Sequence, residues 1–157
     1  FSIPEKMREE VGYLIKGISD EKHQELSPQE IFEIFTSNYV NRETFFSIPD
    51  CHFQKLNGIL TDVTIQQGEK ATIVQSSGNG RLDSVSNAIK AHLGLNYELA
   101  VYEEHAISKG SSSKAVSYVA LIENQKMFWG VGIDEDIFKS STYALVSAAN
   151  KLIAGQK

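Results

Sequence analysis

Two Gly-x-Gly segments, about fifty residues apart, constrain this chain more than any other feature. The first is Gly78-Asn79-Gly80 and the second is Gly130-Val131-Gly132; each follows an apolar run of strand character and precedes a helical pattern. A glycine turn lets backbone amides approach a ligand, and the positive end of the following helix favours an anionic group such as a carboxylate. The pair predicts a duplicated small-molecule site. The alternative is two strand-to-helix turns that need glycine only for their backbone angles.

From about residue 53 the chain repeats one pattern, strands followed by a helix. In the first copy, polar and apolar residues alternate over 62–65, and residues 71–74 are of types common in strands. Apolar residues at helical spacing follow over 82–93, and this stretch ends at Gly94. The second copy has strand patterns at 97–102, 115–122 and 127–129 and a helix stripe from 137 to 152. This predicts an α+β domain of two βββα-like units whose helices pack on one face of sheet. Because an open apolar sheet face favours pairing with a second copy, we expect a homodimer.

The first forty residues have a helical character. Apolar residues at three- and four-residue spacing mark one helix face: Met7, Val11, Leu14, Ile15 and Ile18. Ser27-Pro28-Gln29-Glu30 is typical of a second helix start. Ile48-Pro49-Asp50 interrupts both the helical spacing and the alternation of a strand. We therefore expect a helical linker subdomain over 1–45 and a second domain over 50–157. The apolar helix faces look suited to a neighbour outside the chain.

Composition excludes several classes of function. The chain has 157 residues and a net charge of −5, and its Lys and Arg residues are scattered, so we expect no nucleic-acid partner. No apolar run reaches the roughly twenty residues that cross a bilayer, so we expect no membrane partner. A single cysteine, Cys51, fits a reducing compartment, which favours a cytoplasmic location. The chain begins with Phe1 rather than Met, which suggests a piece of a longer protein.

Catalytic patterns are absent from the sequence. The four histidines form no His-x-His or i,i+4 pair, and Cys51 beside His52 is one adjacent pair and not a ligand set. Glu103 and His105 share one side of a predicted strand, where a solvated strand end explains them better than an acid–base pair. The acidic residues Asp83, Asp134 and Asp136 stand near helix starts, where capping explains them. We expect neither catalysis nor a bound metal or cofactor in this chain.

Several segments occur in an order that resembles a known family. They are Gly78-Asn79-Gly80 with Leu82-Asp83, Tyr102-Glu103-Glu104-His105-Ala106, Trp129-Gly130-Val131-Gly132-Ile133, and the ending with Ser141, Ala144, Ala148 and Asn150. The strand-rich part closely resembles the carboxy-terminal regulatory domain of 2-isopropylmalate synthase, and the preceding helices look like its linker subdomain. The resemblance implies a fragment of an acyltransferase that condenses acetyl-CoA with 3-methyl-2-oxobutanoate in leucine biosynthesis. It also implies that the active site and its divalent metal lie in a catalytic barrel that this chain does not contain.

The resemblance further implies that leucine binds as feedback inhibitor at the dimer interface, near the helix starts. Amides around Gly78, Asn79 and Gly80 would take its carboxylate, and apolar side chains would wall its isobutyl group. The implied effector site comprises Gly78, Asn79, Gly80, Leu82, Asp83, Leu99, Tyr102, Ala106, Ser113, Gly132 and Ile133. Arg81 stands where the family usually has proline, and Ser112-Ser113 where it usually has Asp-Ala. Two alternatives stay open: the same module from citramalate synthase, responding to isoleucine, and a non-catalytic amino-acid-binding or dimerisation module.

Overall fold

Two helices come first in the structure, and two units of three strands and a helix follow. The computed structural model describes residues 2–55, 57–109 and 112–156. The helices are α1 (Glu5–Lys22), α2 (Pro28–Tyr39), α3 (Arg81–Leu93) and α4 (Ile137–Gly155), and the strands are β1 (Ser47–Lys55), β2 (Ile59–Gln67), β3 (Lys70–Gly78), β4 (Glu98–Lys109), β5 (Ser112–Glu123) and β6 (Lys126–Asp134). The α+β class and the repeated βββα order predicted from the sequence are confirmed.

Each unit is an antiparallel sheet with one helix against it. The strand orders are β1-β2-β3 and β4-β5-β6, with α3 against β2 and β3 and α4 against β5 and β6. Along β2, Thr61, Val63 and Ile65 are buried and the residues between them are only partly buried. This period of two is that of a strand with one face on a helix. The outer face of the first sheet is open to solvent, as the exposed Ile73 of β3 shows.

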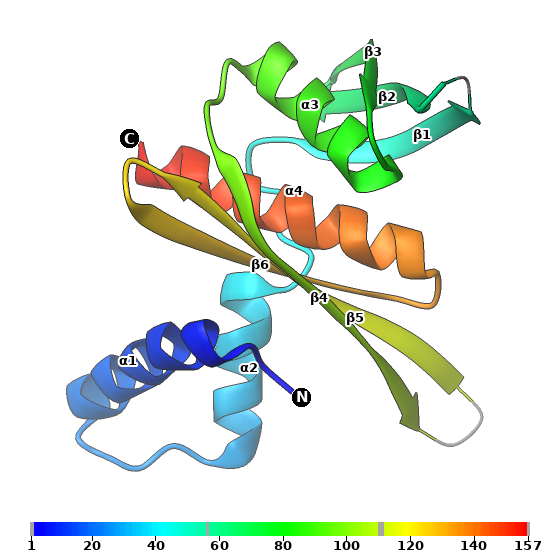
Figure 1. Ribbon diagram of the computed structural model, residues 1–157. Coiled ribbons are helices and arrows are strands. Elements are labelled where there is room, and N and C mark those ends of the chain that lie inside the picture. Colours follow the sequence, from blue (N-terminus) through cyan, green and yellow to red (C-terminus); the bar gives the residue numbers. More distant parts are fainter. Residues whose placement is uncertain (1, 56, 110–111, 157) are drawn as a thin grey trace.

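Helix α4 forms the centre of the molecule. In Figure 1 it runs between the β4-β5-β6 sheet on one side and α3 with the first sheet on the other. Its buried Leu145 belongs to one hydrophobic cluster with Val63 and Ile65 of β2 and Val119 and Leu121 of β5. The two units therefore share a core, because side chains from both sheets meet around one helix.

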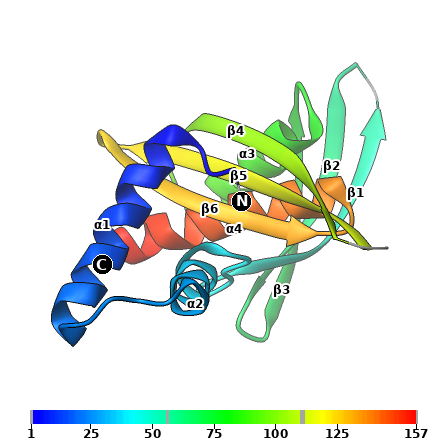
Figure 2. The same ribbon diagram turned by 90° about the horizontal axis from the view of Figure 1, so that it is seen from below.

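The second sheet is covered on both faces. Helices α1 and α2 lie on the side opposite α4, as Figures 1 and 2 show together. Their buried Met7, Val11 and Phe35 pack against Tyr118 and Trp129 of the sheet. The expectation that these apolar faces need a neighbour outside the chain is therefore wrong for these residues. They cover a sheet face that would otherwise expose a buried tryptophan.

The connection from α2 to β1 closes one edge of the second sheet. Val40 forms a parallel bridge with Val131 of β6. The Asn41 amide donates to the Val131 carbonyl at 2.9 Å, and the Asn41 side chain exchanges two hydrogen bonds with the backbone of Ile133, at 3.1 and 3.0 Å. The edge of β6 is thus paired, whereas β4 lies at the other edge of its sheet.

The first strand begins earlier than the sequence suggested. Residues 48–50 were expected to interrupt the regular pattern, yet they belong to β1, which carries an irregularity between Ser47 and Asp50. The expected interruption is wrong, because a β-bulge accommodates Pro49 without ending the strand. The division into subdomains at 1–45 and 50–157 stays a prediction.

The helix ends follow the local sequence signals. Ser27 Oγ accepts from the Glu30 amide and Glu30 Oε1 accepts from the Ser27 amide, both at 3.1 Å, which is the capping box expected at α2. Gly94 ends α3 in the left-handed conformation with φ of 64°. Among the described residues, no helix is both long and apolar enough to span a membrane.

Candidate functional site

The second Gly-x-Gly is part of a strand and not a turn. Gly130 and Gly132 lie inside β6 and are buried against α4. A Cβ added at Gly130 would collide with Ala144 O and Ala148 N, and one at Gly132 would collide with Ser140 O and lie 2.6 Å from Ala144 N. The prediction of a second turn is wrong, because these glycines allow a strand and a helix to pack backbone against backbone.

The first Gly-x-Gly is the predicted strand-to-helix junction. β3 ends at Gly78 and α3 starts after Gly80, which is its N-cap and provides no side-chain cap. The Asn79 amide donates to Asp83 Oδ2 at 2.9 Å, so that amide already has an anionic partner within the chain. The amides of the first helical turn have no partner within a helix, and the helix dipole adds positive potential there. The start of α3 therefore has the electrostatic character that favours an anion.

The start of α4 is different because its own acid caps it. Asp136 Oδ1 accepts from the amides of Phe138 at 2.8 Å and Lys139 at 3.1 Å. Asp134 Oδ2 accepts from the Asp136 amide at 2.8 Å. The capping role expected for Asp134 and Asp136 is confirmed, and this helix start is already satisfied.

Arg81 joins the two helix starts. Its guanidinium carbon lies 5.2 Å from the ring centre of Phe53 and 5.8 Å from that of Phe138. The two rings meet edge to face, with centres 4.8 Å apart. The first turns of α3 and α4 therefore lie on one side of the molecule, in a cluster held by cation–π and aromatic contacts.

An apolar stripe runs along the helix-facing side of β4. Leu99, Tyr102 and Ala106 pair with Leu121, Val119 and Ala115 of β5 and so lie on the same face as α4. α4 packs over β5 and β6, and Leu99 stays 36% exposed and Tyr102 42% exposed. Three of the residues implied by the family resemblance are thus together on one accessible surface.

Tyr102 links this stripe to α4. Its hydroxyl donates to Glu104 Oε2 at 2.7 Å. Burial and this hydrogen bond raise the pKa of Tyr102, whereas hydrogen bonding to Ser141 of α4 and to Ser117 lowers it. The phenol therefore sits at the boundary between the stripe and the helix and stays protonated at neutral pH.

Ile137 is a site residue that the sequence analysis missed. It is the first residue of α4, is 58% exposed, and lies one turn before Ser141 on the same helix side. Since Ser141 reaches Tyr102, Ile137 borders the apolar stripe. The sequence signal that could have found it is an apolar, β-branched residue, Ile137, directly after the acidic N-cap Asp136. A position that only faces solvent does not need such a residue.

Two implied site residues, Gly132 and Ile133, lie elsewhere. Ile133 pairs with Val116, so it faces α1 and α2 on the opposite side of the sheet from Tyr102. Gly132 is sealed beneath α4. Ser113 is exposed and pairs with Ser108, two residues beyond the Ala106–Ala115 pair, so it lies on the same sheet face as the stripe, at its end. Gly110 and Ser111 lie outside the described residues, as does the side chain of Ser112. Within one chain, the structure does not bring Gly132 or Ile133 to the stripe.

The other titratable groups form no reactive cluster in the described part of the chain. His105 and Glu103 share a strand side as expected, with 3.8 Å between Nε2 and Oε1, but they lie inside β4 and not at a strand end. Burial, and then Glu103, raise the pKa of Tyr118 to about 12. Among residues 2–55, 57–109 and 112–156, no three His, Cys, Asp or Glu side chains gather in a way that could hold a metal ion.

The fold and this surface define a class of protein: a duplicated βββα module with an exposed apolar stripe on β4 and a helix, α3, whose start has no side-chain cap. The chain belongs to the LeuA allosteric (dimerisation) domain family, whose sequence profile matches residues 25–153. The family resemblance noted in the sequence is confirmed by this match.

Curated relatives point to one enzyme. The chain is 43% identical to a 2-isopropylmalate synthase of Helicobacter hepaticus, over 97% of this chain and 29% of the relative. It is 44% identical to that of Desulfitobacterium hafniense, over 96% and 27%, and 33% identical to that of Schizosaccharomyces pombe, over 95% and 27%. The chain thus spans less than a third of the length of these relatives.

Proposed function

We propose that this chain is the regulatory region of a 2-isopropylmalate synthase and that it binds leucine as feedback inhibitor at a homodimer interface. Two observations support the proposal: the exposed stripe of Leu99, Tyr102 and Ile137, and the start of α3, which has no side-chain cap. Three of the six large exposed hydrophobic side chains of the described residues border this one surface. Apolar surface gathered in this way is typical of a ligand or protein contact.

Leucine has a carboxylate and an apolar side chain, and the proposed site has one part for each. Its carboxylate would accept from the free amides that follow Gly80 at the start of α3, because the Asn79 amide is held by Asp83. Its isobutyl group would lie on Leu99 and Tyr102. Removing a leucine side chain from water contributes roughly 2 kcal/mol, which an exposed apolar stripe can supply once a second copy covers it.

The remaining functions of the parent enzyme belong outside this chain. Condensation of acetyl-CoA with 3-methyl-2-oxobutanoate, together with the divalent metal, would be the work of a catalytic barrel of the same parent chain, in the cytoplasm. The residues described here would transmit effector binding to that barrel. α1 and α2 are suited to this role because they precede the regulatory units and pack directly on the β4-β5-β6 sheet.

Calorimetry with leucine, isoleucine and alanine tests the proposal. We expect leucine to bind and alanine to bind far more weakly, because alanine lacks the isobutyl group. Gly80→Val should abolish leucine binding at the start of α3 and leave the fold intact, since a Cβ there meets nothing within 4 Å. Gly17→Val is the matched control, because Gly17 on α1 is equally open and lies far along the sequence from α3.

Each outcome of this experiment decides between the readings. A preference for isoleucine would assign the module to citramalate synthase. If none of the three amino acids binds, the chain is a dimerisation module that has no amino-acid effector. Equal leucine binding by Gly80→Val would show that the carboxylate does not lie at the start of α3.

A further inference from the structure

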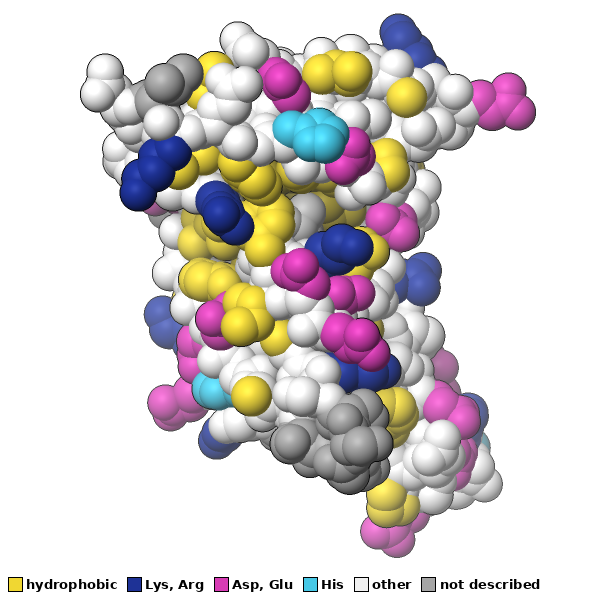
Figure 3. All heavy atoms as spheres, turned by 90° about the vertical axis from the view of Figure 1, so that its right-hand side faces the viewer, with side chains coloured by type: hydrophobic (Ala, Val, Ile, Leu, Met, Phe, Trp, Pro, Cys, Tyr) yellow, Lys and Arg dark blue, Asp and Glu magenta, His cyan; other side chains and the backbone are white. Residues whose placement is uncertain are grey.

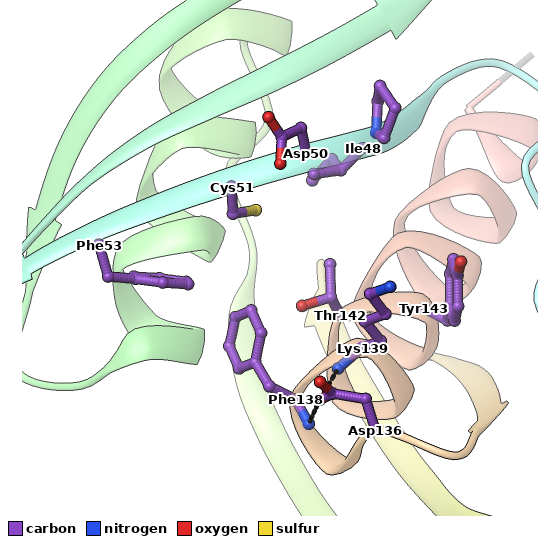
Figure 4. A pocket seen from close by; sticks show the side chains of 10 residues that line it. Ile48, Asp50, Cys51, Phe53, Asp136, Phe138, Lys139, Thr142 and Tyr143 are labelled. Atoms are coloured by element: carbon purple, nitrogen blue, oxygen red, sulfur yellow. Dashed lines mark hydrogen bonds between the residues drawn. The ribbon is translucent and has the colours of Figure 1, made fainter.

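A hollow large enough for a ligand lies between β1 and the first two turns of α4. Its volume is about 270 Å³, and Figure 4 shows Cys51 and Phe53 projecting from β1 and Phe138 and Thr142 projecting from α4 toward it. Cavities of about 150 Å³ already hold a benzene ring. The hollow is therefore large enough for a small aliphatic molecule.

Thr142 has a buried hydroxyl without a partner. The residue is only 6% exposed, and its Oγ1 has no hydrogen bond within the described residues. Its neighbours are satisfied: the Ser141 hydroxyl donates to the Phe138 carbonyl at 2.9 Å, and the Ser140 hydroxyl to Gly132 O at 3.0 Å. A buried unpaired hydroxyl is unfavourable, so the Thr142 hydroxyl is available to a polar atom of a molecule in the hollow.

The rim of the hollow offers a positive charge. Lys139 lies at the rim and forms no ion pair among the described residues. Both rim carboxylates are engaged: Asp50 Oδ2 lies 2.8 Å from His52 Nε2, and Asp136 caps α4. An incoming carboxylate would share the hollow with the carboxylates of Asp50 and Asp136, but the groups without a partner among the described residues are the Lys139 ammonium and the Thr142 hydroxyl.

The walls are apolar and chemically inert. Phe53 and Phe138 form one wall, with their ring centres 4.8 Å apart. Burial, and then the charge of Asp50, raise the pKa of the Cys51 thiol to about 11, so this side chain is an uncharged wall at neutral pH. Figure 3 shows hydrophobic side chains in a band on this face of the molecule, with charged side chains around it.

The hollow is the repeat-related counterpart of the proposed effector site. β1 and β4 are the first strands of the two units, and each carries one extra residue before regular pairing resumes at Asp50 and at Val101. The next residues, Cys51 and Tyr102, both face the helix layer. The proposed effector site would combine the first strand of the second unit with the start of α3. The hollow combines the first strand of the first unit with the start of α4. This comparison rests on the proposed function, whereas the hollow and the unpaired Thr142 do not.

We propose that the hollow between β1 and α4 is a second binding site, for a small aliphatic carboxylate of the size of a branched-chain amino acid or its 2-oxo acid. The carboxylate contacts Lys139 and the Thr142 hydroxyl, and the aliphatic chain lies on Phe53 and Phe138. The site is distinct from the stripe on β4, because it is formed by the other sheet.

The only cysteine of the chain reports on this site alone. We expect leucine or 4-methyl-2-oxopentanoate to slow alkylation of Cys51 by iodoacetamide at least threefold at saturation, and isobutylamine, which lacks the carboxylate, to leave the rate unchanged. Whichever of the two acids protects at lower concentration identifies the source of the ligand. Thr142→Val should raise the protecting concentration about tenfold, which is the loss of one charge-assisted hydrogen bond, and Thr142→Ser should restore it.

Two further variants separate this site from the effector site. Lys139→Gln is an exposed change that should weaken protection even if Thr142→Val folds poorly. Tyr102→Ala should lose the part of the leucine heat that comes from the effector site and keep the protection of Cys51. The proposal is overturned if neither acid protects up to about 10 mM, a very weak affinity for such a ligand. It is also overturned if protection survives both Thr142→Val and Lys139→Gln, or if protection follows protein concentration instead of ligand, which would place a second copy of the chain over the hollow.

Discussion

The side chain of Asn150 binds both backbone polar groups of Phe46. Its Oδ1 accepts from the Phe46 amide at 3.2 Å, and its Nδ2 donates to the Phe46 carbonyl at 3.1 Å. The same amide group also accepts from Phe45 N at 2.6 Å and donates to Arg42 O at 3.2 Å. One side chain of α4, 2% exposed, thus fixes the segment that joins α2 to β1.

Asn150→Ala should destabilise the fold strongly. It removes the partner of the buried backbone amide and carbonyl of Phe46, and each such unpaired group costs about 1–3 kcal/mol. We expect a loss of about 2–4 kcal/mol in urea unfolding. Asn87→Ala is the control, because Asn87 makes one exposed hydrogen bond, to Ser77 O at 2.9 Å, and should cost less than about 1 kcal/mol. Similar losses for both variants would contradict the role given to Asn150.

Gly132→Ala should also be strongly destabilising, by about 3 kcal/mol or more. The added methyl group collides with the backbone of α4 at Ser140, and a helix backbone cannot move aside as a side chain can. Gly17→Ala, in the interior of α1 with nothing within 4 Å, should stabilise by about 0.5–1 kcal/mol. Thermal unfolding of both variants measures this contrast. A tolerated Gly132→Ala would mean that β6 and α4 do not pack as closely as described.

Gly130 and Gly132 show where sequence reasoning stops. The repeated units, the capping box at Ser27 and the end of α3 at Gly94 were predictable, because they depend on local periodicity and local hydrogen bonds. Gly130 and Gly132 were not, because the same pattern serves a turn or a close approach, and only the packing of α4 distinguishes them.

The site was predictable only in part, for a related reason. The side of the sheet on which a residue lies depends on strand pairing, and one residue of register reverses it. β6 continues through Asp134, which puts Ile133 on the α1 and α2 side and leaves Ile137, at the start of α4, beside Tyr102. Leu99, Tyr102 and Ala106 share a face despite their uneven spacing, because the irregularity between Leu99 and Val101 adds one residue.

The Cys51 thiol should titrate late and react slowly. Burial raises its pKa from 9.0 to about 11, so at about pH 8 the thiolate fraction is roughly a hundredfold below that of an unshifted thiol. Because the folded pKa lies above the unfolded one, the stability that this thiol contributes is complete below pH 9.0 and is lost as the pH rises toward 11. Thiolate absorbance against pH, compared with Cys51→Ala, measures the midpoint. A midpoint near 9 would show that the thiol is not buried as described.

The chain should form a homodimer that depends on the exposed side of β4. Covering Leu99 and Tyr102 with a second copy buries apolar surface that the single chain leaves in water. Sedimentation at micromolar concentration should give twice the 17.4 kDa of one chain, and Leu99→Glu should shift the equilibrium to the monomer. Ile73→Glu is the matched control, because Ile73 is 72% exposed on the outer face of the first sheet and should leave the dimer unchanged. Only a monomer for the unmodified chain would refute the dimer.

Leucine binding should depend on one side of the second sheet and not on the other. Ile137→Ala should weaken leucine about fivefold, which corresponds to about 1 kcal/mol of lost apolar contact beside Tyr102. Ile133→Ala removes the same kind of side chain from the opposite side, where it packs near α1 and α2, so it should lower stability and leave leucine affinity within about twofold. Calorimetry with leucine on both variants, each checked for folding by circular dichroism, compares them directly. If Ile133→Ala weakens leucine and Ile137→Ala does not, the effector lies on the side of the sheet that α1 and α2 cover, and the effector site on the β4 stripe is wrong.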